Sequence, residues 1–200
     1  MRNWMTAWTV GTMLAGVSGV SAQEAPGRSA ALTVTIHVTD NANLSPTELA
    51  GAEAYATAAY RAAGLDIVWS SALWTPEAGP LSIGVRLVIV PRDMAEKKCR
   101  EEKLGDSVMG TAISGAKARG RIAYILYDRI ARVAELHQTP VARGLGHVMA
   151  HEVGHLLIGV SSHADEGLMR ANWNPRETRP QTFTGNQVQQ IRRRFMATLG

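Results

Sequence analysis

Residues 139–159 read TPVARGLGHVMAHEVGHLLIG and predict a long helix. Pro140 suits the first helical position, where its missing N–H is not needed, and Gly159 suits a helix end. The second half of the segment is mostly apolar, with Val148, Met149, Val153, Leu156 and Leu157. Because so apolar a helix must be covered on most sides, we expect it to be buried in the centre of the fold.

The residues before this helix predict strands. Residues 32–38 alternate between apolar and polar side chains and are rich in β-branched residues, as in a strand. Residues 65–69, 83–90 and 121–127 are further expected strands. The glycine-rich residues 105–120 show no clear period, so we expect a loop there, with a flap over a cleft as a hypothesis for its role.

Capping residues mark the other expected helices. Ser45 and Glu48 form a capping box with Pro46 at the first helical position, and this helix ends at Gly64. Further helices are expected at residues 93–103, at 128–136 with Asp128 as the cap, and after the capping box of Thr184 and Gln187. This order of elements indicates a small α/β or α+β domain.

The composition fits one globular domain. The chain has 200 residues, of which 46% are hydrophobic and 19% charged, and these values exclude a disordered tail, a coiled coil and a collagen-like chain. The formal net charge of +4 is mild, and the tight basic run at residues 192–194 is expected to be a solvated helix face. We therefore expect neither a nucleic-acid partner nor a stable membrane partner.

The first residues have the order of a secretory signal peptide. Arg2 precedes a mostly apolar run that ends in the small-x-small sequence Val-Ser-Ala at residues 20–22. Cleavage after Ala22 would leave residues 23–200 as the mature domain, secreted or in the periplasm. An uncleaved N-terminal anchor is the alternative.

Cys99 is the single cysteine, so an exported chain of this sequence gains no intramolecular disulfide and must be held by its core. We expect an unpaired thiol on the surface or at a helix end. An intermolecular disulfide and a metal-capping thiolate are the alternatives.

The long helix contains the pattern H-E-x-x-H at residues 151–155. Helix residues four apart lie about 40° apart around the axis and about 6 Å along it, so His151 and His155 can reach one metal ion. Glu152 can stand beside that ion without binding it, as a general base does. Burial of these groups without partners would be costly, and a metal removes that cost; satisfied surface groups are the alternative interpretation.

A catalytic zinc ion takes three protein ligands and keeps one open position. His163 lies four residues beyond Gly159, within about 13 Å of extended reach, and is the expected third ligand. His147 lies about 12 Å along the axis from His155, too far to share one tetrahedral ion with it and His151, so we expect it to pack beside the site. A carboxylate third ligand remains the alternative, from Asp165, Glu166 or Glu177.

The run HEVGHLLIGVSSH at residues 151–163, followed by Gly167-Leu168-Met169, resembles the metzincin zinc peptidases of the matrixin type. It is similar also to a group of short, exported bacterial proteins with H-E-x-x-H-L-L, a delayed His and a Gly-x-Met close behind. The resemblance implies a small catalytic domain with a twisted, mostly parallel sheet of about four strands, a long active-site helix and a C-terminal helix. It also implies that Met169 packs beneath the metal site; an ordinary core methionine is the alternative.

Two positions depart from the metzincin pattern. The pattern has Gly seven and His ten residues after the first His, where this chain has Ile158 and Ser161. Gly159 and His163 follow one and two residues later, so the expected turn is longer than the family's. Met169 keeps the usual offset from the first His.

Together these features predict an exported metalloendopeptidase with one catalytic Zn²⁺ held by His151, His155 and His163. Zinc makes water acidic enough to attack a carbonyl carbon, and Glu152 would take up the proton and return it to the leaving amine. The resemblance implies a peptide or protein substrate extended along a sheet edge, for which residues 121–127 are nominated; an ordinary interior strand is the alternative. A zinc hydrolase of another amide (a cell-wall or small peptide) and a non-catalytic module that binds metal or a partner are the other hypotheses.

Overall fold

The computed structural model describes residues 32–72, 82–115, 120–159 and 162–199. The expected signal peptide and its cleavage site lie outside these residues. Within them, no helix combines the length and the apolar character needed to cross a bilayer.

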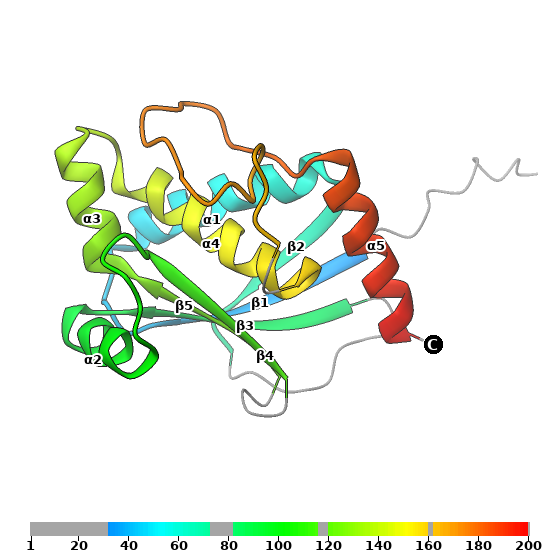
Figure 1. The fold of residues 1–200 in the computed structure, drawn as a ribbon, viewed down its shortest axis with the longest axis horizontal. Coiled ribbons are helices and arrows are strands. Elements are labelled where there is room, and N and C mark those ends of the chain that lie inside the picture. The colour runs from blue at the N-terminus through cyan, green and yellow to red at the C-terminus, as the bar shows by residue number, and fades with distance from the viewer. Residues whose placement is uncertain (1–31, 73–81, 116–119, 160–161, 200) are drawn as a thin grey trace, which may run out of the picture.

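Five strands form one twisted sheet in the order β2-β1-β3-β5-β4 (Figure 1). β1 (Leu32–Asp40) lies between β2 (Leu65–Ser70) and β3 (Ser82–Val90), and both pairs are parallel. β5 (Gly120–Leu126) continues the parallel sheet beside β3. β4 (Gly110–Gly115) pairs antiparallel with β5 and forms an edge of the sheet. The protein therefore has the expected α/β fold with a mostly parallel sheet.

The structure corrects two expectations for the middle of the chain. The segment expected to be a loop, residues 105–120, contains the edge strand β4. Residues 121–127, nominated as the sheet edge, form most of β5, which lies inside the sheet between β3 and β4. The sequence did not predict β4 because its short, glycine-bounded segment has no strand pattern of its own. It becomes a strand by pairing with β5, where Ala112 lies opposite Ala123.

Two helices, α1 (Pro46–Ala62) and α4 (Val141–Ile158), cover one face of the sheet (Figure 1). They approach closely at Gly146, because a Cβ there would stand 2.5 Å from the carbonyl oxygen of Ala52. The buried hydroxyl of Tyr60 donates a hydrogen bond of 2.7 Å to the carbonyl oxygen of Ala150. The long helix is thus buried in the centre of the fold, as its apolar sequence predicted.

The other face of the sheet carries a smaller core beneath α2 (Arg92–Glu102). Cys99 lies on this helix as a partly buried free thiol that packs against the smaller core. The smaller core consists of Val88, Val90, Ala95, Ile122 and Leu126.

Two further helices complete the domain, α3 (Tyr127–Leu136) and α5 (Gly185–Leu199). Asp128 does not cap α3, contrary to expectation; it lies in the first turn, because β5 leads directly into the helix and Leu126 takes the cap position without a side-chain hydrogen bond. The capping box before α5 does form, with the Thr184 backbone N–H donating to Oε1 of Gln187 at 2.9 Å.

The start of α1 is also as expected, with Oγ of Ser45 accepting from the backbone N–H of Glu48 at 3.2 Å. The Glu48 carboxylate does not close the box; it accepts a hydrogen bond of 2.8 Å from the hydroxyl of Tyr127 instead. This bond ties the beginning of α1 to the beginning of α3.

Candidate metal centre

Three histidine rings direct their Nε2 atoms at one another. The Nε2 atoms of His151 and His155 are 3.0 Å apart, and that of His163 lies 3.3 Å from the first and 3.2 Å from the second. Ligands of a tetrahedral ion with metal–nitrogen bonds of 2.0–2.1 Å stand about 3.3 Å apart. The three histidines therefore lie close enough to bind one metal ion.

The other nitrogen of each helical histidine is held by a hydrogen bond. Nδ1 of His151 donates to the carbonyl oxygen of Leu168 at 2.8 Å, and Nδ1 of His155 pairs with Oγ of Ser162 at 3.0 Å. With the proton on Nδ1, each Nε2 keeps a lone pair, and the lone pairs converge. Two such lone pairs directed at each other and at Nε2 of His163 repel one another unless a cation lies between them, so the donor set itself fits a metal ion.

The turn that brings His163 to the helix depends on the end of α4. Gly159 has φ 140°, a backbone conformation that favours glycine, and it reverses the chain beyond the helix. Arg194 of α5 donates from Nη1 to the carbonyl oxygen of Ile158, one of the helix-end carbonyls that α4 itself cannot satisfy. The C-terminal helix thus stabilises the point at which the chain leaves for His163.

Burial keeps the two helical histidines neutral. Burial lowers the pKa of His155 to about 4, with smaller contributions from the nearby His151 and His163. Burial is also the largest cause of the lowered pKa of His151, which its bond to Leu168 partly opposes. Both rings are therefore uncharged at neutral pH, the form that binds a metal.

His147 lies beside the cluster and outside it, as expected. It is 3% exposed, and its ring stacks on Trp173 with centroids 5.0 Å apart and an interplanar angle of 18°. Burial, followed by the neighbouring His151, lowers its pKa to about 3. Among the described residues, its buried Nδ1 has no hydrogen-bond partner, so His147 serves as a packed, neutral wall residue.

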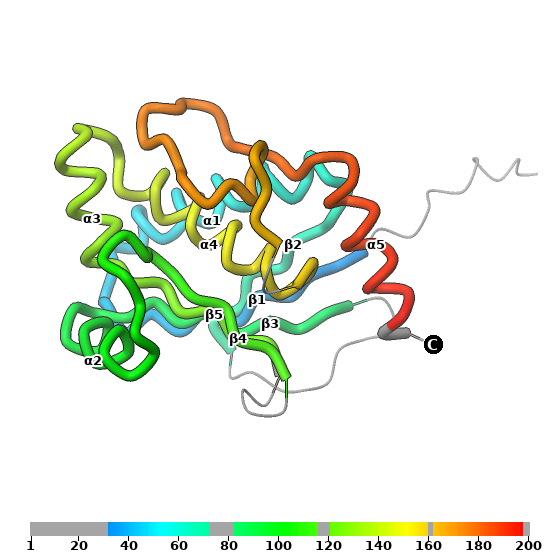
Figure 2. The backbone as a smooth tube through the Cα atoms, in the orientation of Figure 1, coloured from blue at the N-terminus to red at the C-terminus, as the bar shows by residue number. Residues whose placement is uncertain are grey.

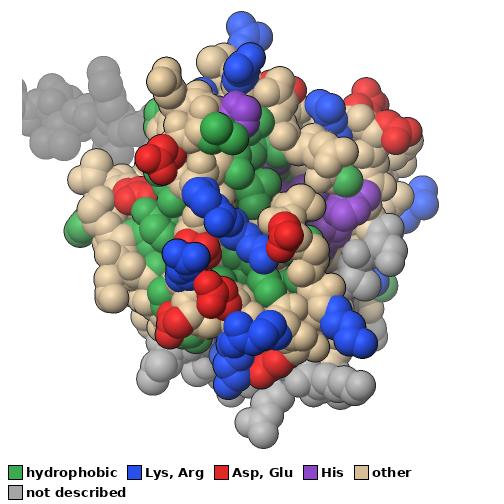
Figure 3. Space-filling model, turned by 60° about the vertical axis from the view of Figure 1, so that its left-hand side comes forward, with side chains coloured by type: hydrophobic (Ala, Val, Ile, Leu, Met, Phe, Trp, Pro, Cys, Tyr) green, Lys and Arg blue, Asp and Glu red, His purple; other side chains and the backbone are tan. Residues whose placement is uncertain are grey.

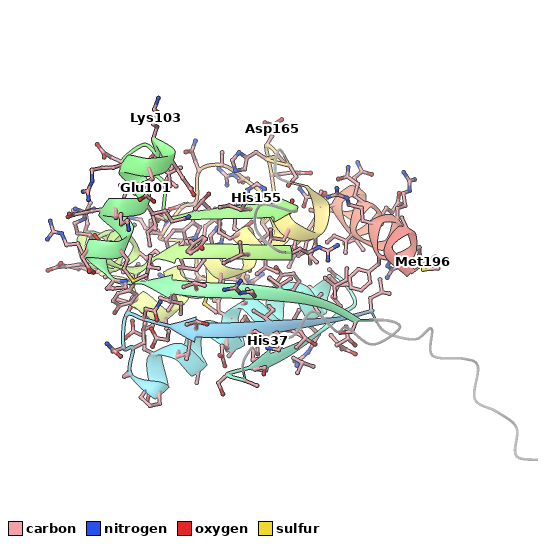
Figure 4. All side chains as sticks on the ribbon, turned by 90° about the horizontal axis from the view of Figure 1, so that it is seen from below. His37, Glu101, Lys103, His155, Asp165 and Met196 are labelled. Carbon is pink, nitrogen blue, oxygen red and sulfur yellow. The ribbon has the colours of Figure 1, made fainter. Side chains whose placement is uncertain are left out.

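The carboxylates considered as third ligands lie elsewhere. Asp165 and Glu166 are exposed, and Figure 4 shows Asp165 on the outside of its loop, pointing away from His155. Glu177 forms an ion pair with Nη1 of Arg170 at 3.5 Å. Across the described part of the chain, the structure brings His163 to the two helical histidines, and no carboxylate joins the group.

Glu152 lines the same cleft with an unpaired carboxyl group. It is 7% exposed, burial raises its pKa to about 8, and within the described residues it makes no hydrogen bond or ion pair. Its side chain packs on the backbone of β4 at Gly110, where a Cβ would stand 2.5 Å from the Cγ of Glu152. A carboxyl group with a pKa near neutrality can both accept and donate a proton.

The segment after His163 runs back along α4 before α5 begins (Figure 2). Met169 is fully buried under the helix at Gly154, and farther back Trp173 packs on Gly144. The turn is fixed by backbone bonds, with Ala164 N–H donating to the Met169 carbonyl at 2.9 Å. Met169 thus packs against α4 between the two helical histidines, a position that both the implied packing role and an ordinary core methionine would have.

A cleft of about 410 Å³ opens over the histidines and Glu152. Met109 and the first residues of β4, Gly110 to Ala112, line it, together with Arg170 and Trp173 from the segment after His163. Figure 3 shows histidine side chains gathered in a recess on one side of the surface. The site can therefore admit an extended molecule along the edge of the sheet.

Sequence reasoning missed three residues that shape this site. Gly110 carried no signal because β4 itself was not expected, and Trp173 lies in a segment without periodicity. Ser162 could have been noticed, since it immediately precedes His163 and a metal-binding histidine needs a hydrogen-bond partner.

Comparison with known proteins adds no relative: no protein-family model and no curated protein matches the chain.

Proposed function

We propose that the chain is an exported, zinc-dependent endopeptidase. The observation that carries this proposal is the convergence of three Nε2 atoms within 3.0–3.3 Å of one another beside the unpaired carboxyl group of Glu152, in an open cleft. A purely structural zinc site closes all four positions and has no use for a neighbouring base. The export part of the proposal rests on the sequence of residues 1–22.

The donor set supports zinc as the ion. Three neutral imidazoles at tetrahedral spacing are the ligands of many catalytic zinc sites, whereas magnesium and calcium prefer oxygen donors. When bound there, zinc would supply Lewis acidity to the carbonyl oxygen of the substrate and make water a stronger acid.

Glu152 would act first as the general base and then as the general acid of the reaction. In its ionised form the carboxylate accepts a proton from the attacking water, and in its protonated form it donates that proton to the leaving amine. Its burial favours the first transfer, because a raised pKa makes the carboxylate a stronger base, and a pKa near neutrality still allows the proton to be passed on to the more basic amine.

The edge strand supports a peptide as the substrate. β4 is paired on one side only within the described sheet, and its residues from Gly110 to Ala112 border the cleft. An extended peptide could add to this edge through backbone hydrogen bonds and so place one of its carbonyl groups over the histidines. We therefore propose β4 as the strand that pairs with the substrate, in place of residues 121–127 of the interior strand β5.

The test is the metal content and peptide-library cleavage of the wild type beside His163→Ala and Glu152→Gln. We expect one zinc ion per wild-type chain, loss of zinc and cleavage in His163→Ala, and retention of zinc without cleavage in Glu152→Gln. His37→Ala is the matched control, because His37 lies on β1, away from the cleft (Figure 4), and should leave both properties unchanged.

Three outcomes would contradict the proposal in different ways. Zinc retained by His163→Ala would remove His163 from the ligand set. Cleavage retained by Glu152→Gln would remove Glu152 as the base. A wild type that binds zinc and cleaves no peptide in the library, but opens cell-wall fragments, would move the substrate to another amide.

A further inference from the structure

A second cavity, of about 430 Å³, lies at the other end of the edge strand. Its polar lining comes from Ser114 and Gly115 at the end of β4, Arg121 at the start of β5 and Arg194 of α5. Leu156 and Leu157, at the end of α4, form an apolar wall.

Its charge is positive. The lining contains two arginines and no acidic residue. The guanidinium of Arg194 is engaged with the carbonyl oxygen of Ile158, whereas that of Arg121 forms no hydrogen bond or ion pair with the described residues. Burial, and then the positive charge of Arg194, lowers the pKa of Arg121. A half-buried cation without an anion beside it is costly, and an anionic ligand would offset that cost.

The cavity is aligned with the proposed cleavage site. Gly110, at one end of β4, packs against Glu152, while Ser114 shares the cavity with Leu156, one helical turn further along α4. Four residues of strand separate Gly110 from Ser114, or about 13 Å. A peptide extended along β4 over the cleft would therefore reach the second cavity within a few residues of the bond that is cleaved.

The position of Arg121 defines what could reach it. Ser114 is the register partner of Arg121, so both side chains lie on the same face of the sheet. Arg121 stands one strand behind the edge, and a peptide added to β4 would lie about 9–10 Å from the β5 backbone. A long acidic side chain of the peptide and the side chain of Arg121 can together span that distance. The methylene groups of the acidic side chain would then lie against Leu156.

We propose that the cavity between β4, β5 and α5 binds the carboxylate of a glutamate side chain in the peptide substrate, with Arg121 as the specificity-determining residue. A carboxylate is the ligand that matches the planar, forked guanidinium with two parallel hydrogen bonds. This inference rests on the proposed peptidase function and names its substrate class: peptides with a glutamate a few residues from the bond that is cleaved.

The test uses full-length, zinc-loaded protein carrying Glu152→Gln, which is expected to bind peptide without cleaving it. Fluorescence anisotropy would measure its affinity for labelled peptides in which one position at a time is Glu or Gln. We expect one position at which Glu binds about tenfold more tightly than Gln. The added variant Arg121→Gln should remove this difference, and Arg121→Lys, which keeps the charge but not the two parallel hydrogen bonds, should retain only part of it.

Arg193→Gln is the matched control. It also replaces an arginine by glutamine, but at an exposed position of α5, next to Arg194 in sequence, that does not line the cavity. The inference is overturned if no position prefers Glu, or if Arg121→Gln keeps the preference. If Arg121→Gln folds poorly, the affinities of the protein with Arg121 intact for Glu and Gln peptides still test the inference.

Cleavage of the same peptides by the wild type separates this inference from the function on which it rests. Arg121-dependent binding of Glu peptides without any cleavage would overturn the peptidase and keep the carboxylate site. Cleavage with equal kcat/KM for Glu and Gln at every position would keep the peptidase and overturn the carboxylate site. Absence of both binding and cleavage would overturn both.

Discussion

The Sδ atom of Met169 occupies the space that a side chain at Gly154 would need, since a Cβ on Gly154 would stand 2.6 Å from it. Gly154 lies on α4 between the two helical histidines. Met169 follows Leu168, whose carbonyl accepts the hydrogen bond from His151. The contact therefore sets the distance between the helix that carries two metal ligands and the turn that orients one of them.

Gly154→Ala should destabilise the protein despite its higher helix propensity. In an open helix the change would stabilise by about 1 kcal/mol, but here the new methyl group displaces Met169, and we expect a net loss of about 1–3 kcal/mol. Urea unfolding of the metal-free protein measures this change. Met169→Ala in the same chain should make Gly154→Ala much less harmful; equal effects in both backgrounds would show that the two residues are not coupled.

Gly110→Ala should reduce cleavage while leaving zinc binding intact. The added methyl would stand 2.5 Å from the Cγ of Glu152, so the carboxyl group must move, and a displacement of about 1 Å can lower the rate about a hundredfold. Steady-state kinetics and zinc content of one preparation measure both effects. Gly105→Ala is the control, because nothing lies within 4 Å of a Cβ at that position. Unchanged kcat in Gly110→Ala would exclude this positioning role.

Ser162→Ala should weaken zinc binding. Its Oγ holds Nδ1 of His155 at 3.0 Å, and loss of such a partner lowers metal affinity about 10–100-fold. Competition with a chromophoric chelator measures the affinity. Ser107→Ala, a serine of the same cleft without a hydrogen bond to the histidines, should bind zinc like the wild type. An affinity equal to that of the wild type in Ser162→Ala would show that His155 does not depend on this bond.

His147 should make the metal-free protein less stable in acid. Its pKa is about 3 in the folded protein, against an ordinary value of 6.5, so between these two pH values the unfolded chain binds the extra proton. The free energy of unfolding contributed by His147 is fully present above pH 6.5 and falls as the pH drops toward 3, by up to about 1.4 kcal/mol per pH unit.

His147→Phe keeps a ring against Trp173 and removes the titrating group. Chemical unfolding at several pH values in the presence of a chelator should then show a shallower loss of stability in acid than in the wild type. Parallel curves for the two proteins would mean that His147 takes up its proton without cost in the folded state.

The fold was predictable where local chemistry specifies it. The capping serine of α1, the buried sequence of α4 and the alternating pattern of β1 each determine their element without help from distant residues. β4 could not be predicted, because a short segment bounded by glycines becomes a strand only through its pairing with β5. The same missing strand explains why β5 was nominated as the edge.

The residues of the site also fall into those that local sequence predicts and those that depend on contacts between distant segments. The spacing of His151, Glu152 and His155 on one helix is a local property, and the sequence alone predicted their grouping. The third histidine depended on the path of the chain after Gly159, and by length alone Asp165 or Glu166 could have served as well. Gly110 and Ser162 act through contacts between segments, so only the folded chain reveals them.

The bond from Arg194 to the carbonyl oxygen of Ile158 spans 36 residues of sequence. During synthesis, the residues proposed to bind the metal emerge well before the helix that secures the end of α4. A nascent chain whose α5 has not yet emerged therefore lacks the contact that stabilises the end of α4 before the turn toward His163. For a secreted hydrolase of the proposed kind, this order of appearance would delay the onset of activity until α5 has been made and has packed against the end of α4, which would protect the proteins of the cell that makes it.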